Sequence, residues 1–241
     1  MPKKWHNYLC NNSNNFSHHQ SKVHMSSYKI TTYEVGDMQN LVYLVKGNNS
    51  SDVILFDIGW DADKIIKIIQ ENNLNLKAVA LTHSHYDHTN ALPDLLEKYP
   101  VPVYISPPEL DFWHECNITD KKLIKTIKDN DEIKIGTNKI KVILTPGHSP
   151  GSVCYLLEQH LITGDTLFLN SAGRTDLSGG NAKELYQSLN KLKKIVNDDI
   201  IIMSGHLYGD VNQNTFGEQR ITNPFLKIDN KDDFEKFCNR I

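Results

Sequence analysis

Hydrophobic and polar residues follow each other along the first half of the chain in short runs that are typical of β-strands, interrupted by two segments with helical spacing. Gly and Asn clusters separate the runs, as turns do between strands. Between residues 61 and 72 the isoleucines recur on one face, which indicates a helix. The elements predicted here are strands at Lys29–Val35, Leu41–Lys46 and Val53–Asp57, a helix over Asp61–Asn72, a strand at Lys77–Thr82, a helix with Leu92, Leu95 and Leu96, and a strand at Val101–Ser106.

The second half repeats this order of strands, helix and strand. Its predicted elements are hairpins of Glu132–Ile135 with Lys139–Leu144 and of Ser152–Leu157 with His160–Thr163, a helix over Asn181–Val196 and a strand at Ile200–Met203. The repetition suggests two packed sheets with helices outside. Because no Pro-rich or Gly-rich linker separates the halves, we expect residues 28–241 to form one domain with internal duplication.

Residues 1–27 differ in composition, since they are rich in Asn, Ser and His and contain no acidic residue. We expect a disordered tail or leader. No apolar segment follows Lys3 and Lys4, which argues against a secretory signal peptide. The basic, Ser-rich character leaves organellar targeting as an alternative to a cytoplasmic location. In a reducing compartment the four separate cysteines would be free thiols, at Cys10, Cys116, Cys154 and Cys238.

Composition excludes several functional classes. The chain has 241 residues and a formal charge of −3, and it contains no apolar run long enough to cross a membrane. A slightly acidic chain without basic clusters is unsuited to nucleic acid. We therefore expect neither nucleic acid nor membrane as a partner. There are eleven histidines against only four cysteines, and histidine is the side chain most often used for metals and acid–base chemistry.

A cluster of candidate metal ligands comes directly after the strand that ends near Thr82. Residues 83–88 contain His83, His85, Asp87 and His88. Imidazole and carboxylate groups are unfavourable to bury unless they are paired or bound to metal. In an extended strand, His83, His85 and Asp87 would share one face. In a loop that leads into a helix, His83 and His85 can face one metal while Asp87 and His88 face another.

Three further candidates occupy equivalent places later in the chain. His148, Asp165 and His206 each follow an apolar run and come directly after a glycine. Glycine allows a sharp turn and a close approach to neighbouring groups. A single histidine of this kind is more often an ordinary loop residue, but three repeats of one placement indicate a shared site.

Together these residues resemble the metallo-β-lactamase superfamily, with HxHxDH at 83–88 followed by His148, Asp165 and His206. The resemblance covers residues 28–226. It implies an α+β fold, the αββα sandwich of two mixed sheets flanked by helices. It also implies that His83, His85 and His148 hold a first metal ion, that Asp87, His88 and His206 hold a second, and that Asp165 bridges them.

Seven nitrogen and oxygen ligands are too many for one tetrahedral zinc and suit two ions that share a carboxylate. We expect two divalent ions, zinc first, with iron or manganese as alternatives. Such a pair generates hydroxide from water at neutral pH, and Asp87 would orient that nucleophile as the catalytic residue. The GxSxG motif of serine hydrolases is absent.

Within the superfamily, the chain resembles the compact single-domain members of the glyoxalase II (hydroxyacylglutathione hydrolase) group. The segments that carry this resemblance are Gly173–Asp176, Gly179-Gly180, Thr215–Glu218 and Thr222–Phe225. It implies hydrolysis of a small-molecule thioester, an S-acyl conjugate of glutathione or a similar thiol. We expect no counterpart of the helical domain that follows in full-length members, because 35 residues of this sequence follow His206. Retention of Asp165 disfavours the β-lactamase branches.

Several residues are candidates for substrate contacts. Arg174 could bind a substrate carboxylate, or it could instead pair with Asp176 and stiffen its own loop. Tyr208 and Phe168 would line the mouth of the site. His114 and His160 lie outside the ligand pattern and are expected to be surface or capping residues. The sequence leaves the oligomeric state open.

Two rival functions remain. A persulfide dioxygenase of the same superfamily resembles the chain in its ligands and its Arg-Thr-Asp segment. It uses one iron ion, which could be held by His83, His148 and Asp165 as a 2-His-1-carboxylate set. A non-catalytic metal-binding protein is the third class, and the complete set of seven ligands argues against it.

Overall fold

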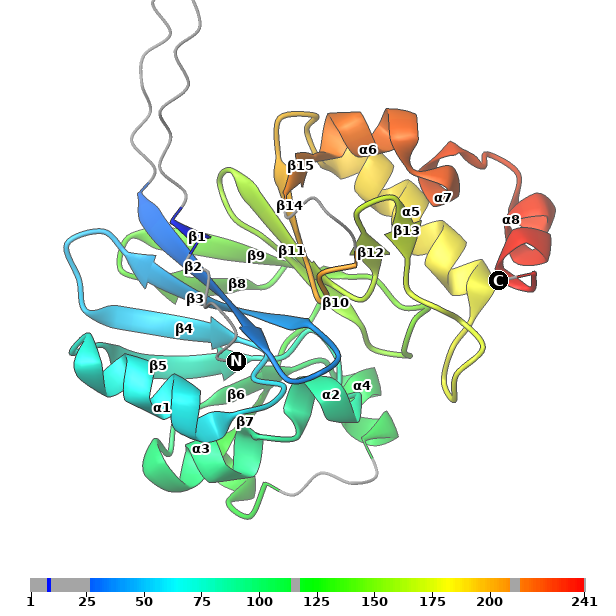
Figure 1. Cartoon of the computed structure of the whole chain (residues 1–241). Helices are drawn as coiled ribbons and strands as arrows, with labels where there is room; N and C mark the ends of the chain where they lie inside the picture. The colour runs from blue at the N-terminus through cyan, green and yellow to red at the C-terminus, as the bar shows by residue number, and fades with distance from the viewer. Residues whose placement is uncertain (1–7, 10–26, 114–117, 209–212, 241) are drawn as a thin grey trace, which may run out of the picture.

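Two β-sheets pack face to face with helices on both outer sides, in a computed structural model that describes residues 8–9, 27–113, 118–208 and 213–240 (Figure 1). This confirms the predicted α+β sandwich of two mixed sheets. Tyr8 and Leu9 pair with the strand at residues 28–35. The rest of the segment up to residue 26 lies outside the described residues, so the tail or leader stays a prediction. Cys10, Cys116 and His114 also lie outside the described residues.

The first sheet has seven strands in sequence order, from β1 to β7. Neighbours from β1 to β4 pair antiparallel, and those from β4 to β7 pair parallel. The strands are β1 (Tyr8–Leu9), β2 (Tyr28–Val35), β3 (Asn40–Gly47), β4 (Asp52–Phe56), β5 (Asn75–Ala80), β6 (Val103–Ile105) and β7 (Ile124–Thr126). The helices of this half are α1 (Ala62–Glu71), α2 (Tyr86–Thr89), α3 (Leu92–Lys98) and α4 (Pro107–Phe112), with a 3₁₀ turn at Lys121–Leu123.

The second sheet has six strands in the order β15-β14-β11-β10-β9-β8, and only the β11–β14 pair is parallel. Its strands are β8 (Glu132–Ile135), β9 (Asn138–Leu144), β10 (Val153–Leu156), β11 (His160–Gly164), β14 (Ile201–Ser204) and β15 (Asn214–Thr215). A small hairpin, β12 (Leu167–Phe168) with β13 (Ser171–Ala172), stands apart from it. The helices of this half are α5 (Ala182–Ile195), α6 (Phe216–Thr222), α7 (Pro224–Lys227) and α8 (Lys231–Cys238).

Three layers of apolar side chains hold this arrangement together. Strand β3 shows how, because its successive side chains point to opposite faces. Tyr43 and Val45 pack between the two sheets, whereas Val42 and Leu44 pack under α1 and α3. A third cluster lies between the second sheet and helices α5 to α8. Strands buried on both faces explain why the sequence reads as nearly continuous apolar runs.

Hydrogen bonds cap the ends of helices and connect the two sheets. The side chain of Asn181 accepts a hydrogen bond from the Glu184 amide and so caps α5 at its predicted start. The Tyr155 hydroxyl on β10 donates to the Leu81 carbonyl at the end of β5, 2.7 Å away, which ties the two sheets together near the histidine-rich loop.

His160 was expected at the surface or in a cap, and that expectation is wrong. It is 8% exposed on β11, and its Nδ1 lies 2.8 Å from the Tyr28 hydroxyl on β2. The sequence cannot show this pairing because the two residues are 132 positions apart.

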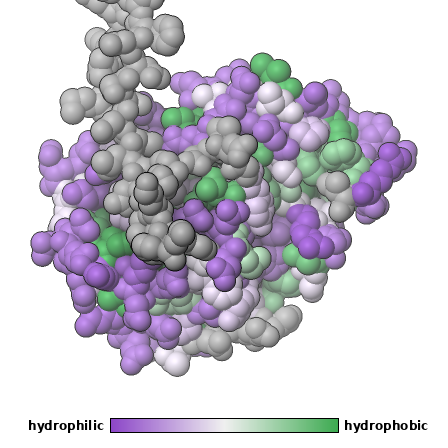
Figure 2. All heavy atoms as spheres, viewed as in Figure 1, coloured by the Kyte–Doolittle hydropathy of each residue, from purple (hydrophilic) through white to green (hydrophobic). Residues whose placement is uncertain are grey.

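The outer surface is mainly polar. Hydrophilic residues cover most of the face shown in Figure 2, and apolar residues appear there in small separate groups. None of the helices in the described part of the chain combines the length and the apolar character needed to cross a membrane. Cys154 and Cys238, the two cysteines among the described residues, are both free thiols, as expected.

Candidate metal centre

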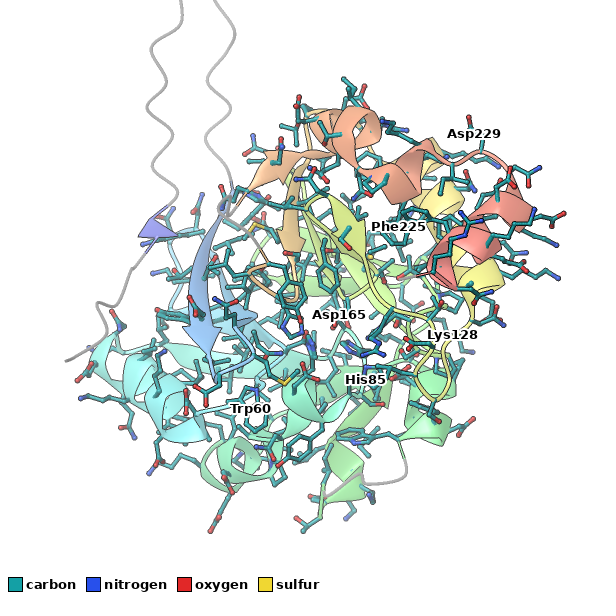
Figure 3. All side chains as sticks on the ribbon, turned by 45° about the vertical axis from the view of Figure 1, so that its right-hand side comes forward. Trp60, His85, Lys128, Asp165, Phe225 and Asp229 are labelled. Carbon is teal, nitrogen blue, oxygen red and sulfur yellow. The ribbon has the colours of Figure 1, made fainter. Side chains whose placement is uncertain are left out.

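The predicted ligands converge at one edge of the sandwich, where several strands end. His83 and His85 follow β5, Asp87 and His88 lie in α2, and His148 follows β9. The remaining two, Asp165 and His206, come after the parallel neighbours β11 and β14, whose carboxyl ends meet at the same edge. Figure 3 shows Asp165 and His85 close together between the two sheets.

All seven predicted ligands lie in this cluster. Their donor atoms form three overlapping groups, each with every atom within 4.8 Å of the others. The groups are His83, His85 and His148; Asp87, His88 and His206; and His83, His88 and Asp165. The first two groups are the sets that the family resemblance assigns to two separate ions. The loop interpretation of residues 83–88 is therefore the one that the geometry supports.

Asp165 lies between these two groups. Its Oδ1 is 3.3 Å from His88 Nε2, while its Oδ2 is 3.6 Å from His148 Nε2 and 3.4 Å from His206 Nε2. Within the first group, His85 Nδ1 is 2.9 Å from His148 Nε2. Within the second, His206 Nε2 is 3.1 Å from Asp87 Oδ2. One carboxylate thus reaches both groups, as a bridging ligand must.

The ring nitrogens that face away from the centre have partners of their own. His148 Nδ1 lies 2.8 Å from the Arg174 carbonyl oxygen, and His206 Nδ1 lies 2.9 Å from the Met38 carbonyl oxygen. A carbonyl can only accept, so these Nδ1 atoms carry the proton. Their Nε2 atoms therefore point into the cluster, and each can bind a metal ion once it carries no proton.

Three buried side-chain atoms among the described residues lack a hydrogen-bond partner, and two of them belong to the cluster: His83 Nε2 and Asp165 Oδ1. The third, Arg220 Nε, lies 2.7 Å from Asp198 Oδ1 in an ion pair outside the cluster. A buried polar atom without a partner costs about 1–3 kcal/mol, so such atoms call for an explanation. A cation at the centre supplies it, because five imidazoles and two carboxylates are suitable donors for zinc, iron or manganese. The residues present therefore fit the two-metal site that the fold implies.

The electrostatics keep both acids ionised. Burial would raise the pKa of Asp165, but the charge of His88 and the hydrogen bond from His206 hold that pKa well below its usual range. Burial would also raise the pKa of Asp87, but the hydrogen bond from His206 and the charge of His88 outweigh it, so this pKa is lowered as well. Burial lowers the pKa of His206, but hydrogen bonds to Asp165 and Asp87 outweigh it and raise this pKa to about 9. Metal binding would displace that proton.

Two glycines allow the ligands to come this close. A Cβ on Gly205 would lie 2.2 Å from Asp165 Oδ1, so no larger residue fits beside that carboxylate. Gly164, which precedes Asp165, has a φ of 49°, and a Cβ there would lie 2.4 Å from Thr82 Oγ1. The glycine placement noted in the sequence thus serves close approach at both positions.

Sequence reasoning missed three polar residues that hold the ligands in place. The first is Asn40 at the start of β3, which is 1% exposed. Its Nδ2 donates to Asp87 Oδ2 over 2.9 Å, and its Oδ1 accepts from Trp60 Nε1 over 3.1 Å. No local signal identifies this asparagine, since Asn is common at turns between strands.

The second is Asp57, which follows β4 with a left-handed φ of 53°. Its carboxylate accepts hydrogen bonds from the Thr82 amide and hydroxyl, both at 2.7 Å, and lies 2.9 Å from His88 Nδ1. Its place at the end of an apolar strand, the same signal as for Asp165, could have identified it.

The third is Glu109 in α4, a fully buried carboxylate. Its Oε1 accepts from the amide and hydroxyl of Ser84, both at 2.7 Å. Its Oε2 accepts from the Ser149 hydroxyl at 2.7 Å and the Gly151 amide at 2.8 Å. Glu109 thereby joins the loop of His83 and His85 to the loop of His148, the three residues of the first group. In the sequence it resembles an ordinary acid in the first turn of a helix.

Two of the predicted substrate contacts, Tyr208 and Phe168, lie beside the second group. Tyr208 stacks on His206 with ring centroids 4.8 Å apart, and the Phe168 ring meets His206 edge-on at 5.9 Å. Arg174 forms two hydrogen bonds to Asp176, at 2.7 and 2.6 Å, which is the loop-pairing alternative. Both residues of this pair are largely exposed.

Comparison with known proteins places these features in a family. The model of the metallo-β-lactamase superfamily matches residues 35–206. A Bacillus subtilis relative, named "Probable polyketide biosynthesis zinc-dependent hydrolase PksB", is 34% identical over 202 residues, which cover 83% of this chain and 88% of the relative. The crystal structure of ETHE1 from Myxococcus xanthus is similar with a TM-score of 0.76 and 26% identity, covering 87% of this chain and 89% of that one. The structure of TTHA1623 in a di-iron-bound form has a TM-score of 0.70 and 28% identity, covering 81% of this chain and 99% of that one.

Proposed function

The chain belongs to the metallo-β-lactamase superfamily, and from that premise we propose that it is a metal-dependent hydrolase of thioesters. The substrates we propose are S-acyl conjugates of glutathione or a similar small thiol. We propose a small molecule as the partner, rather than nucleic acid or a membrane. The proposed cofactors are two divalent ions, preferably zinc.

One observation carries the proposal: two groups of three ligands share Asp165, with buried, unpartnered atoms of His83 and Asp165 at their centre. This is the donor set for two ions rather than one. Such a pair, when bound, lowers the pKa of a water molecule to near neutrality and polarises a carbonyl group. The zinc-dependent hydrolase among the relatives supports this chemistry.

The side chains around the ions have distinct tasks. Asp87 is partly open to solvent, with a side chain 16% exposed, and its lowered pKa keeps it an anionic hydrogen-bond acceptor. It would align the attacking water, while Asn40 holds the aspartate itself in place. In the reaction, a C–O bond forms at the thioester carbonyl and the C–S bond breaks. The products are a carboxylic acid and a thiol, and water supplies the proton that the thiolate takes up.

The walls of the second group suit the thiol half of the substrate. Tyr208 is 52% exposed and extends outward from His206, with Phe168 beside both rings. Asn223, within a segment that carries the glyoxalase II resemblance, donates hydrogen bonds to the Phe168 and Ser171 carbonyls and so supports this wall. We propose that Arg174 contacts a thiol carboxylate after exchanging its exposed partner Asp176, because exposed ion pairs are weak.

A persulfide dioxygenase with one iron ion is the second candidate. Asp165 Oδ2 is 3.6 Å from His148 Nε2, and Asp165 shares a ligand group with His83, so a 2-His-1-carboxylate set for iron is available. The di-iron-bound neighbour supports iron as an occupant of such sites.

A panel of thioesters that includes lactoylglutathione, assayed on protein of measured metal content, tests the proposal. We expect thiol release with two metal ions per chain, and a loss of at least about 100-fold in kcat for Asp87→Ala. Oxygen uptake with glutathione persulfide on protein that holds one iron ion, without thioester hydrolysis, would establish the second candidate instead. Unchanged turnover in Asp87→Ala would remove Asp87 from the mechanism.

A further inference from the structure

A cavity of about 250 Å³ lies on the other side of His85 from the ligand cluster. It lies where α2, the start of α3 and the end of α4 meet, and Figure 1 shows α2 beside α4. Its apolar walls are Tyr86, Leu92, Pro93, Phe112, Trp113 and Ile118. None of these side chains takes part in the ligand groups.

The polar side chains in these walls are Ser84, His85, Thr89 and Asn90, and the hydroxyls of Ser84 and Thr89 already donate hydrogen bonds within the protein. The Ser84 hydroxyl donates to Glu109, and the Thr89 hydroxyl donates to the His85 carbonyl 3.2 Å away. A ligand in the cavity would therefore meet mainly aliphatic and aromatic surface. An apolar group gains free energy there in proportion to its buried area, whereas a charged group would lose its hydration without finding partners.

The cavity is one imidazole ring away from the proposed reaction centre. His85 Nδ1 faces His148 in the first ligand group, while the His85 ring meets the Phe112 ring edge-on at 6.5 Å. A thioester carbonyl at the ligand cluster carries two substituents, the acyl chain and the thiol. On the side of His206 the cluster is bordered by Tyr208, which stacks on His206 and is 52% exposed, so a charged thiol can remain hydrated there. The cavity on the side of His85 suits the acyl chain.

We infer that this cavity binds the acyl group of the substrate and selects unbranched apolar acyl chains over short hydroxyacyl groups. The inference rests on the proposed function and narrows its substrate class. Each methylene that enters such a cavity raises kcat/KM by up to about fourfold. Activity should thus rise along a series of glutathione thioesters from acetyl through butanoyl to hexanoyl, and lactoyl should resemble acetyl.

Trp113→Ala tests the inference, with Trp113→Phe as the conservative variant and Ile221→Ala as a control at an exposed apolar residue of α6. We expect Trp113→Ala to lose most of the rise with chain length while its acetyl activity persists. Trp113→Phe should retain the rise, and Ile221→Ala should match the wild type within about twofold. A wild-type profile that is flat with chain length, or an equal loss for all acyl groups in Trp113→Ala, would overturn the inference.

Binding of the free acids separates this inference from the proposed function. Calorimetry on the zinc-loaded protein should show tighter binding of hexanoate than of acetate, and Trp113→Ala should abolish the difference. If no thioester is hydrolysed but hexanoate still binds more tightly, the proposed function fails and the cavity assignment stands. Equal binding of the two acids by the wild type contradicts the cavity assignment, whatever the enzyme hydrolyses.

Discussion

The side-chain amide of Asn40 donates a hydrogen bond to Asp87 across 2.9 Å, although the two residues are 47 positions apart. Asn40 is buried at the start of β3, and Trp60 Nε1 holds its carbonyl oxygen in turn. Asp87 is the ligand that we propose to align the attacking water. Its orientation therefore depends on a residue that is not itself one of the seven ligands and lies far from the HxHxDH motif in the sequence.

Replacing Asn40 by Ala should lower kcat by about 10–100-fold, because Asp87 loses the partner that fixes its carboxylate. KM and the content of tightly bound metal should change less, since the seven ligands remain. Steady-state kinetics with metal analysis of the same sample measures this. Trp60→Phe, which removes only the donor to Asn40, is the matched milder variant. If Asn40→Ala keeps wild-type kcat, Asp87 needs no such orientation.

The hydrogen bonds of Glu109 lead to a separate prediction about the affinity of the first ligand group for metal. Glu109→Gln places an amide NH₂ among four donors, so at least one of Ser84, Ser149 and Gly151 loses its acceptor. The loops of His83, His85 and His148 should loosen, and the affinity of the first ligand group for zinc should fall by about 10–100-fold. Competition with a chelator, followed for both zinc equivalents, measures this.

The second group, which contains His206 and Asp87, should keep its affinity in Glu109→Gln. Glu97→Gln, at an exposed position in α3, is the control and should bind both ions as the wild type does. An equal loss of both zinc ions in Glu109→Gln would mean that Glu109 supports the fold in general rather than the first group.

The burial of His160 should make the free energy of unfolding depend on pH. Burial lowers its pKa to about 4, whereas an exposed histidine titrates near 6.5. Between these values the unfolded chain takes up a proton that the folded chain does not. Stability should therefore fall as the pH decreases from 6.5 to 4, with up to about 3 kcal/mol of the loss arising from this residue.

His160→Gln removes that titration and tests the prediction by urea unfolding at several pH values. Both proteins are kept free of metal by a chelator, so that the ligand histidines contribute equally. The variant should show a shallower decrease in the free energy of unfolding below pH 6.5. Parallel curves for the two proteins would show that His160 has an ordinary pKa in the folded state.

The sequence predicts much of this architecture because local pattern determines it. The longer strands and helices α1 and α5 match the expected ranges closely, and α3 contains the three leucines named for it, since each shows one clear period of apolar residues. The seven ligands stand out because chemically distinctive residues follow apolar strands, several of them next to glycine. Short elements such as α2, α4 and α7 have too few residues to show a period.

Long-range proximity accounts for the rest. Asn40 and Glu109 acquire their roles from partners 25 or more positions away, and the residues next to them in the sequence give no sign of these roles. In the sequence His160 has no visible role, and its partner Tyr28 comes next to it only when the two sheets pack together. The cavity beside His85 is formed by three separate helical segments and has no counterpart in any linear motif.

Zinc titration of the metal-free protein against thioester hydrolysis tests the central claim most directly. The two ligand groups sharing Asp165 predict that activity rises with added zinc until two equivalents are bound, and that Asp165→Asn at saturating zinc lowers kcat by at least about 100-fold. Full hydrolytic activity at one equivalent, or hydrolysis that persists in the metal-free protein, would contradict the two-metal account.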